Sequence, residues 1–187
     1  SDLQNTDPAE VGVRLERING ICRKATAMKD GVALTVPLSK EIYAGIYKLN
    51  AKYDKCNWSG FSNVYVGIAK ADYKIPYPCN PLNEPNRQNM LGYFGLTGNV
   101  GFNGKWTEGN RKFSDGQILT MELNMDAGTL HFFVDNEQQP VYVRGINDAV
   151  KFYGNLFYRE SSFTVVVVKK LSIATVKKLP NEIAVEF

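Results

Sequence analysis

The sequence predicts an all-β protein, an antiparallel β-sandwich of two curved sheets, and three observations lead to this fold class. Apolar residues occupy every second position over residues 119–125 and again over 130–134, the period of a strand with one buried face. Turn-forming residues separate these runs at 126–128 and 135–138. No segment shows a sustained helical period. Residues 117–143 are therefore expected to form a three-stranded meander.

Composition limits the possible classes of protein. A chain of 187 residues, 44% of them hydrophobic, suits a single folded domain over residues 1–187, with a core over about 20–170 and a loose stretch at 1–10. A net charge of +3 is too mild to indicate a nucleic-acid partner. No apolar run is long enough for membrane insertion.

The cysteines and the single histidine argue against metal and disulfide chemistry. Cys22, Cys56 and Cys79 are odd in number and widely spaced, so they predict neither a disulfide framework nor a zinc site. We expect reduced thiols in an intracellular, cytoplasmic protein that needs no metal and no cofactor.

The remaining elements follow in chain order. Residues 9–19 are compatible with a short helix or a strand. Strands are expected at 21–26 and 32–38 around the turn at Lys29–Gly31, at 47–53, and at 64–68, where Gly67 leaves room for a close neighbour. After a loop at 54–62, a glycine-punctuated strand pair spans 92–104. Further strands are expected at 152–158, 163–168 and 183–187, which gives about ten to thirteen strands, enough for two packed sheets.

Residues 73–89 form the one long stretch without a strand pattern. Four prolines interrupt it, at positions 76, 78, 81 and 85, and prolines cannot join a sheet ladder. The stretch also carries tyrosine, asparagine and arginine side chains. Long irregular loops in small domains often carry function, so this loop is a candidate binding surface.

Four stretches resemble the SPRY domain, in that family's order. They are residues 45–51 (G-I-Y-K-L-N-A), 64–69 (V-Y-V-G-I-A), 92–98 (G-Y-F-G-L-T-G) and 114–133, which resembles G-D-x-I-G-x-x-L-D-x-x-x-G-T-L-x-F. The chain departs from the family pattern where Gln117 replaces an acidic residue, where Asp135–Glu137 replaces a K-N-G turn, and at Lys48–Asn50. The resemblance implies a divergent concanavalin-like sandwich whose end loops bind a partner.

By position in the motif order, three stretches match the family's partner-binding loops. They supply Pro37; Tyr73, Tyr77, Asn83, Glu84 and Arg87; and Tyr158 with Arg159. Exposed tyrosine and arginine are favoured anchors because they bury area and still form hydrogen bonds. The implied function is a non-catalytic adaptor module that binds a protein or peptide epitope, and we expect the isolated domain to be a monomer.

Enzymatic alternatives lack their residues. A catalytic triad would need His131, which we expect on a strand surface. A glycosidase would need two converging carboxylates, and Glu122 with Asp126 is the nearest pair, with Glu122 expected on a solvated face. No catalytic residue is therefore assigned. If a glycoside hydrolase activity were found, its full loss in Glu122→Gln would revive the hydrolase hypothesis.

A carbohydrate-binding lectin of the same architecture is the alternative function. Lectin sites stack an aromatic ring on the sugar beside amide or acidic groups, and Trp106 with Asn103 and Glu108 offers such a set. The sequence leaves the choice between peptide and glycan open.

Overall fold

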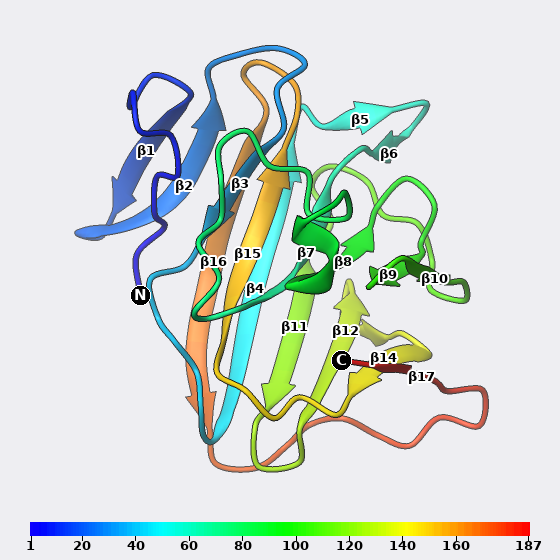
Figure 1. The fold of residues 1–187 in the computed structure, drawn as a ribbon. Coiled ribbons are helices and arrows are strands. Elements are labelled where there is room, and N and C mark those ends of the chain that lie inside the picture. The colour runs from blue at the N-terminus through cyan, green and yellow to red at the C-terminus, as the bar shows by residue number, and fades with distance from the viewer.

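Two β-sheets stacked face to face make up the computed structural model, which describes residues 1–187 (Figure 1). The larger sheet has nine strands. In spatial order they are β1 (Val13–Ile18), β2 (Ile21–Ala27), β16 (Ser162–Leu171), β4 (Ile46–Asp54), β11 (Leu119–Asn124), β12 (Thr129–Val134), β14 (Val141–Arg144) and β17 (Ile183–Glu186), with β13 (Glu137–Gln138) paired to β12.

The smaller sheet has six strands. Their order is β10 (Lys105–Thr107), β9 (Val100–Phe102), β8 (Met90–Phe94), β7 (Tyr65–Lys70), β15 (Val150–Leu156) and β3 (Leu34–Pro37). A hairpin of β5 (Asn57–Trp58) and β6 (Phe61–Ser62) and one short 3₁₀ helix, η1 (Asn86–Gln88), complete the elements. The predicted all-β sandwich is confirmed. The single helix is far too short to cross a membrane.

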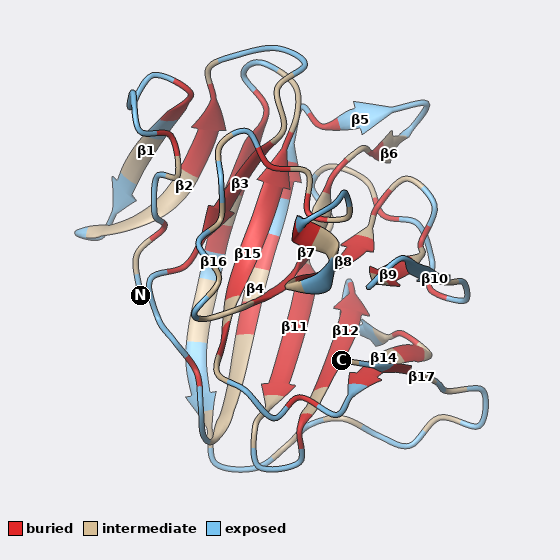
Figure 2. Cartoon of the chain, viewed as in Figure 1, coloured by how far each residue is buried: buried red, intermediate tan, exposed pale blue.

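The core lies between the two sheets because alternate side chains of each strand point inward. Leu119, Met121 and Leu123 of β11 are almost fully buried, as the alternation predicted, and they belong to a cluster of 34 buried residues (Figure 2). Phe152 and Phe163, from β15 and β16, belong to the same cluster.

The predicted elements are largely present. The meander is formed by β11, β12, β13 and β14, and the ambiguous residues 9–19 contain the strand β1. The loop expected at 54–62 contains the β5–β6 hairpin. The closing strand is β17, which pairs with β14 in parallel, whereas every other strand pairing is antiparallel.

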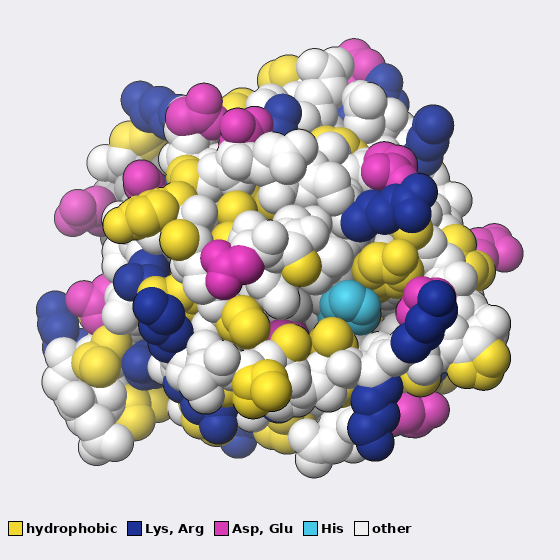
Figure 3. All heavy atoms as spheres, turned by 90° about the horizontal axis from the view of Figure 1, so that it is seen from below, with side chains coloured by type: hydrophobic (Ala, Val, Ile, Leu, Met, Phe, Trp, Pro, Cys, Tyr) yellow, Lys and Arg dark blue, Asp and Glu magenta, His cyan; other side chains and the backbone are white.

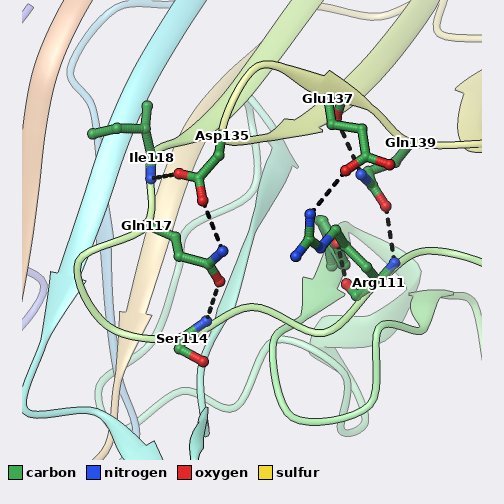
Figure 4. A network of polar contacts seen from close by, with 8 residues as sticks. Arg111, Ser114, Gln117, Ile118, Asp135, Glu137 and Gln139 are labelled. Carbon is green, nitrogen blue, oxygen red and sulfur yellow. Dashed lines mark hydrogen bonds and ion pairs between the residues drawn. The ribbon is translucent and has the colours of Figure 1, made fainter.

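The two departures from the family pattern at Gln117 and Asp135 contact each other (Figure 4). Gln117 Nε2 donates to Asp135 Oδ2 at 2.8 Å, while Gln117 Oε1 accepts from the Ser114 N–H at 2.8 Å. Asp135 Oδ1 accepts from the Ile118 N–H at 2.9 Å. The two side chains therefore close the turn before β11 onto the turn after β12.

Two polar residues expected on a solvated face are buried instead. Glu122 is 1% exposed and His131 is 8% exposed, on the outer face of the nine-stranded sheet. The segment between β16 and β17 crosses this face, and Thr175 donates both its backbone N–H (2.7 Å to Oε1) and its hydroxyl to the Glu122 carboxylate. The alternation correctly assigned the face, but a distant part of the chain covers it.

The first ten residues, expected to be loose, are held against both sheets. The Leu3 N–H donates to the Cys22 carbonyl (3.0 Å) and the Gln4 N–H to the Pro37 carbonyl (2.9 Å). Asp7 is 5% exposed because its carboxylate accepts the N–H groups of Val11 and Gly12. Buried apolar residues accordingly extend beyond 20–170, with Leu3 near one terminus and Val185 near the other.

Candidate functional site: a groove beside the proline-rich loop

The proline-rich loop lies across the outer face of the six-stranded sheet. The Cys79 N–H donates to the Ala33 carbonyl (2.9 Å), and the Thr35 hydroxyl donates to the Cys79 carbonyl (3.0 Å). Cys79 also packs with Met90 and Tyr153 in a second small core outside the sandwich. The loop is therefore fixed to rigid strands, so that a partner bound to it would lose little further chain entropy.

Asparagine side chains shape the outer part of this loop. Buried Asn86 accepts the Tyr73 hydroxyl (2.6 Å) and donates to the Asn80 carbonyl (2.8 Å), while Asn80 Oδ1 accepts the Leu82 N–H (3.0 Å). These bonds replace a regular ladder, which the prolines forbid. They leave the side chains of Asn83 and Glu84 exposed at the tip.

A groove of about 480 Å³ opens where this loop meets two others. Its walls come from residues 31–33, which lead into β3, from Asn83 and Glu84 of the loop, and from Phe157 after β15. A smaller hollow shares Asn80 and Phe157 with the groove and continues it along the sheet.

The continuation is lined by Asn63, Tyr65 and Asn155. Asn63 Nδ2 donates to the Tyr158 hydroxyl oxygen at 2.9 Å, which fixes the amide at the groove wall. Burial raises the pKa of Tyr65 to about 12, so its hydroxyl is protonated and neutral at physiological pH. The lining of the groove combines neutral amides with aromatic rings, and Glu84 is its single charged side chain.

An aromatic cluster adjoins the groove. The rings of Tyr65 and Phe94 stack at 4.5 Å between centroids, and Trp106 lies 6.4 Å from each of them. Trp106 is 47% exposed, and Thr97 and Asn99 border the same hollow. Because Tyr65 lines both hollows, the groove and the cluster form one continuous surface, which we call the groove–platform.

The structure brings some of the sequence-predicted residues to this surface. Asn83 and Glu84 line the groove, and Glu84 pairs with Arg87. Tyr158 lies behind the wall that Asn63 forms, and the Arg159 N–H donates to Asp30 Oδ1 (3.1 Å), which ties its loop to the Lys29–Gly31 turn.

Three other residues of the predicted set lie elsewhere. Pro37 is buried within β3, an edge strand that the N-terminal segment covers, so it is not part of an open loop. Pro37 and Tyr73 line a separate hollow together with Lys70. Tyr77 packs against Gly12, where an added Cβ would lie 2.3 Å from its hydroxyl oxygen.

Sequence reasoning missed Asn63, Tyr65 and Phe157. The alternation of residues 64–68 does contain a signal for Tyr65, since Val64 and Val66 point into the core and Tyr65 must therefore point out. Nothing in the sequence indicated that residues 157 and 80, far apart along the chain, share a wall.

The residues considered for catalysis have structural contacts. The Asp126 carboxylate accepts the Gly45 N–H (3.0 Å), and Glu122 is bound by Thr175. His131 stacks on Tyr142 with 4.7 Å between ring centroids, and burial lowers its pKa, against the opposing charges of Glu122 and Glu182. No three His, Cys, Asp or Glu side chains gather as metal ligands would.

Solved structures of similar fold include the SPRY domain of human HERC1. It matches with a TM-score of 0.64 and 18% sequence identity, over 90% of this chain and 99% of that one. The PSpry domain of TRIM65 matches with a TM-score of 0.60 and 14% identity, over 89% and 93%. This chain has the SPRY fold.

The resemblance seen in the sequence is thus confirmed for a divergent SPRY sandwich. Stonustoxin also matches, with a TM-score of 0.56 and 18% identity, over 89% of this chain and 27% of the toxin chain. No protein-family model and no curated protein sequence matches. The SPRY likeness therefore concerns the fold, and function has to be argued from the surface.

Proposed function

We propose that this chain is a single-domain, non-catalytic interaction module that holds an extended segment of a partner protein in the groove–platform. The observation that carries the proposal is the continuity of an amide-lined groove with a half-exposed aromatic cluster on one rigid sheet face. Amides can pair with the backbone of an extended peptide, and the platform offers an anchor for one apolar side chain.

The charges around the surface favour an uncharged ligand segment. The side chains of Glu84 and Arg87 pair with each other, which leaves little net charge at the groove. On the face shown in Figure 3, several Lys and Arg side chains gather at the lower left, and elsewhere they are interspersed with Asp and Glu. The groove itself is lined by no Lys or Arg side chain, so it gives no support to a nucleic-acid partner.

The three free cysteines support an intracellular adaptor. Cys56 and Cys79 are buried and Cys22 is partly buried, and all three are thiols. Unpaired thiols are typical of a reducing compartment, so we propose a cytoplasmic location.

Panning of a random peptide display library on the wild-type chain tests the proposal. We expect enriched peptides, and we expect their affinity for the Trp106→Ala variant to be at least about tenfold lower than for the wild type, because the aromatic cluster loses its exposed ring. Trp58→Ala is a matched control, since Trp58 is 59% exposed on β5 but lines neither hollow. Failure to enrich any peptide, or equal loss in both variants, would contradict the proposal.

A carbohydrate ligand is the second candidate, and the exposed Trp106 beside Thr97 and Asn99 favours it. Asn103 and Glu108 are the other two residues that the sequence offers as sugar contacts. The backbone N–H of Asn103 is already bonded to the Arg87 carbonyl (2.8 Å), and Glu108 is exposed. A glycan array distinguishes the two: binding that Trp106→Ala removes would support the lectin reading, and an array without binding would remove it.

A further inference from the structure

Strand β1 forms an open edge of the nine-stranded sheet. It pairs with β2 on one side, and no strand pairs with its other side. The Met28 N–H donates to the Gly12 carbonyl (2.9 Å), so the backbone carbonyl of Gly12 faces β2. Backbone groups of every second residue point to the same side of a strand, so those of Arg14 and Glu16 also bond to β2. The backbone N–H and C=O groups of the alternate residues Val13, Leu15 and Arg17 therefore point away from the sheet, available to another strand.

The side chains of β1 carry charges that β2 does not fully pair. Arg14 is exposed and has no ion-pair partner. Glu16 has Lys24 Nζ at 3.5 Å, and its Oε2 has no hydrogen-bond donor. Arg14 and Glu16 lie two positions apart and hence on one face of the sheet, on either side of Leu15.

This strand is complementary to a second copy of itself. If two β1 strands pair antiparallel about a twofold axis at Leu15, then Arg14 lies opposite Glu16 of the second copy, and Glu16 opposite its Arg14. The free backbone groups of Leu15 bond to their symmetry mates, and those of Val13 bond to those of Arg17 in the second copy. The arginine and glutamate fall at the non-bonded positions, where side chains approach most closely.

Other registers are disfavoured by the same charges. A shift of the pairing by two residues in one direction places Arg14 opposite Arg14 of the second copy. A shift by two residues in the other direction places Glu16 opposite Glu16 of the second copy. Like charges directly opposite destabilise a strand pair. A shift of one residue turns the core-facing Val13 and Leu15 toward the charged face. Charges often protect edge strands against pairing, but this alternation of signs around a central leucine permits one pairing.

We propose that two copies of this chain associate through antiparallel pairing of their β1 edges, which joins the two nine-stranded sheets into one continuous sheet. Val11, which precedes the strand, and Ile18, its last residue, are 55% and 43% exposed and would gain cover in the pair. The sequence alone led us to expect a monomer, and the charge pattern at this edge now favours a dimer. The interface is small, so the dimer is weak and forms at high protein concentration.

Sedimentation equilibrium on the whole chain, at concentrations up to about 1 mM, tests the proposal. We expect concentration-dependent dimers for the wild type and monomers for Arg14→Glu and for Glu16→Arg, because each puts like charges opposite each other. An equimolar mixture of these two variants is expected to form heterodimers, since every opposing pair is then of opposite sign. The double variant R14E/E16R, which exchanges the charges within one chain, is expected to dimerise as the wild type does.

Lys105→Glu, an exposed change on the free edge strand β10 of the other sheet, serves as the matched control and should leave the dimer intact. Circular dichroism confirms that each variant folds. A wild type that stays monomeric over the whole range would overturn the proposal. So would a dimer that survives either single charge change, or a mixture that remains monomeric.

Discussion

At the scale of single residues, close approach between strands explains why a glycine stands at position 67. A Cβ added there would lie 1.8 Å from the Leu91 carbonyl oxygen of the neighbouring strand β8. Backbone atoms in the middle of a sheet cannot shift without breaking their own hydrogen bonds. The space anticipated from the sequence at Gly67 is therefore a strict requirement of the β7–β8 pairing.

Gly67→Ala is expected to destabilise the protein by about 3 kcal/mol or more, measured as the change in unfolding free energy in urea. Gly31→Ala provides the control, because an added Cβ at Gly31 meets nothing within 4 Å and only the positive φ of 68° would strain an alanine there. That change should cost about 1 kcal/mol. Equal costs for the two variants would show that crowding at Gly67 is unimportant.

The three cysteines differ in burial, so we expect them to differ in reactivity. Burial and the charge of Asp115 raise the pKa of Cys56 to about 12, and burial raises that of Cys79 to about 11. Both thiols therefore stay protonated at about pH 8, whereas the partly exposed Cys22 is accessible. We expect a chromogenic disulfide reagent to modify only Cys22 in the native protein and all three after denaturation, and rapid native modification of Cys56 or Cys79 would contradict this.

At the scale of elements, pairs of turns and segments distant in the sequence hold strands in place. The contact of Gln117 with Asp135 joins the two turns at one end of the β11–β12 hairpin, and Arg111 and Glu137 form a neighbouring ion pair (Figure 4). The side chains of Gln117 and Asp135 also accept backbone N–H groups, whereas the ion pair of Arg111 and Glu137 joins side chains alone. The two pairs can therefore be compared directly.

A double-mutant cycle on Gln117→Ala and Asp135→Ala should give a coupling free energy of about 1 kcal/mol, because their side chains also hold the Ser114 and Ile118 N–H groups. The same cycle on Arg111 and Glu137 should give less than about 0.5 kcal/mol, since these side chains are 48% and 66% exposed. Urea unfolding of the six variants measures both couplings. A larger coupling for Arg111 with Glu137 than for Gln117 with Asp135 would refute this ranking.

The segment that crosses the nine-stranded sheet should depend on its bond to Glu122. Thr175→Val removes one of the two donors to a buried carboxylate, so we expect a loss of about 1–2 kcal/mol and faster proteolysis within residues 172–182. Ser172→Ala, an exposed change in the same segment, is the control. Unchanged cleavage in Thr175→Val would mean that other contacts hold the segment.

At the scale of the whole molecule, the cover over the outer face makes stability depend on pH through His131. Burial lowers its pKa in the folded state, while Glu122 and Glu182 act in the opposite sense. The unfolded chain therefore binds the proton more readily, and stability is lost as the pH falls below the unfolded value of about 6.5. The loss is at most about 1.4 kcal/mol for each pH unit.

Unfolding free energies of the wild type and His131→Gln at about pH 7.5 and about pH 5.5 test this linkage. The variant should lose less stability on acidification, because it lacks the titrating ring. Identical losses would show that His131 does not set the pH dependence of stability.

The sequence by itself determined the strands, the faces they bury and the sandwich, because alternation and turn residues act over short stretches of chain. Leu119, Met121 and Leu123 illustrate this, as does the SPRY resemblance that the fold confirms. Only the tertiary structure decided what covers Glu122 and that Asn63, Asn80 and Phe157 share one groove. Those contacts join segments up to about a hundred residues apart, whose relative placement depends on the packing of both sheets and leaves no local pattern in the sequence.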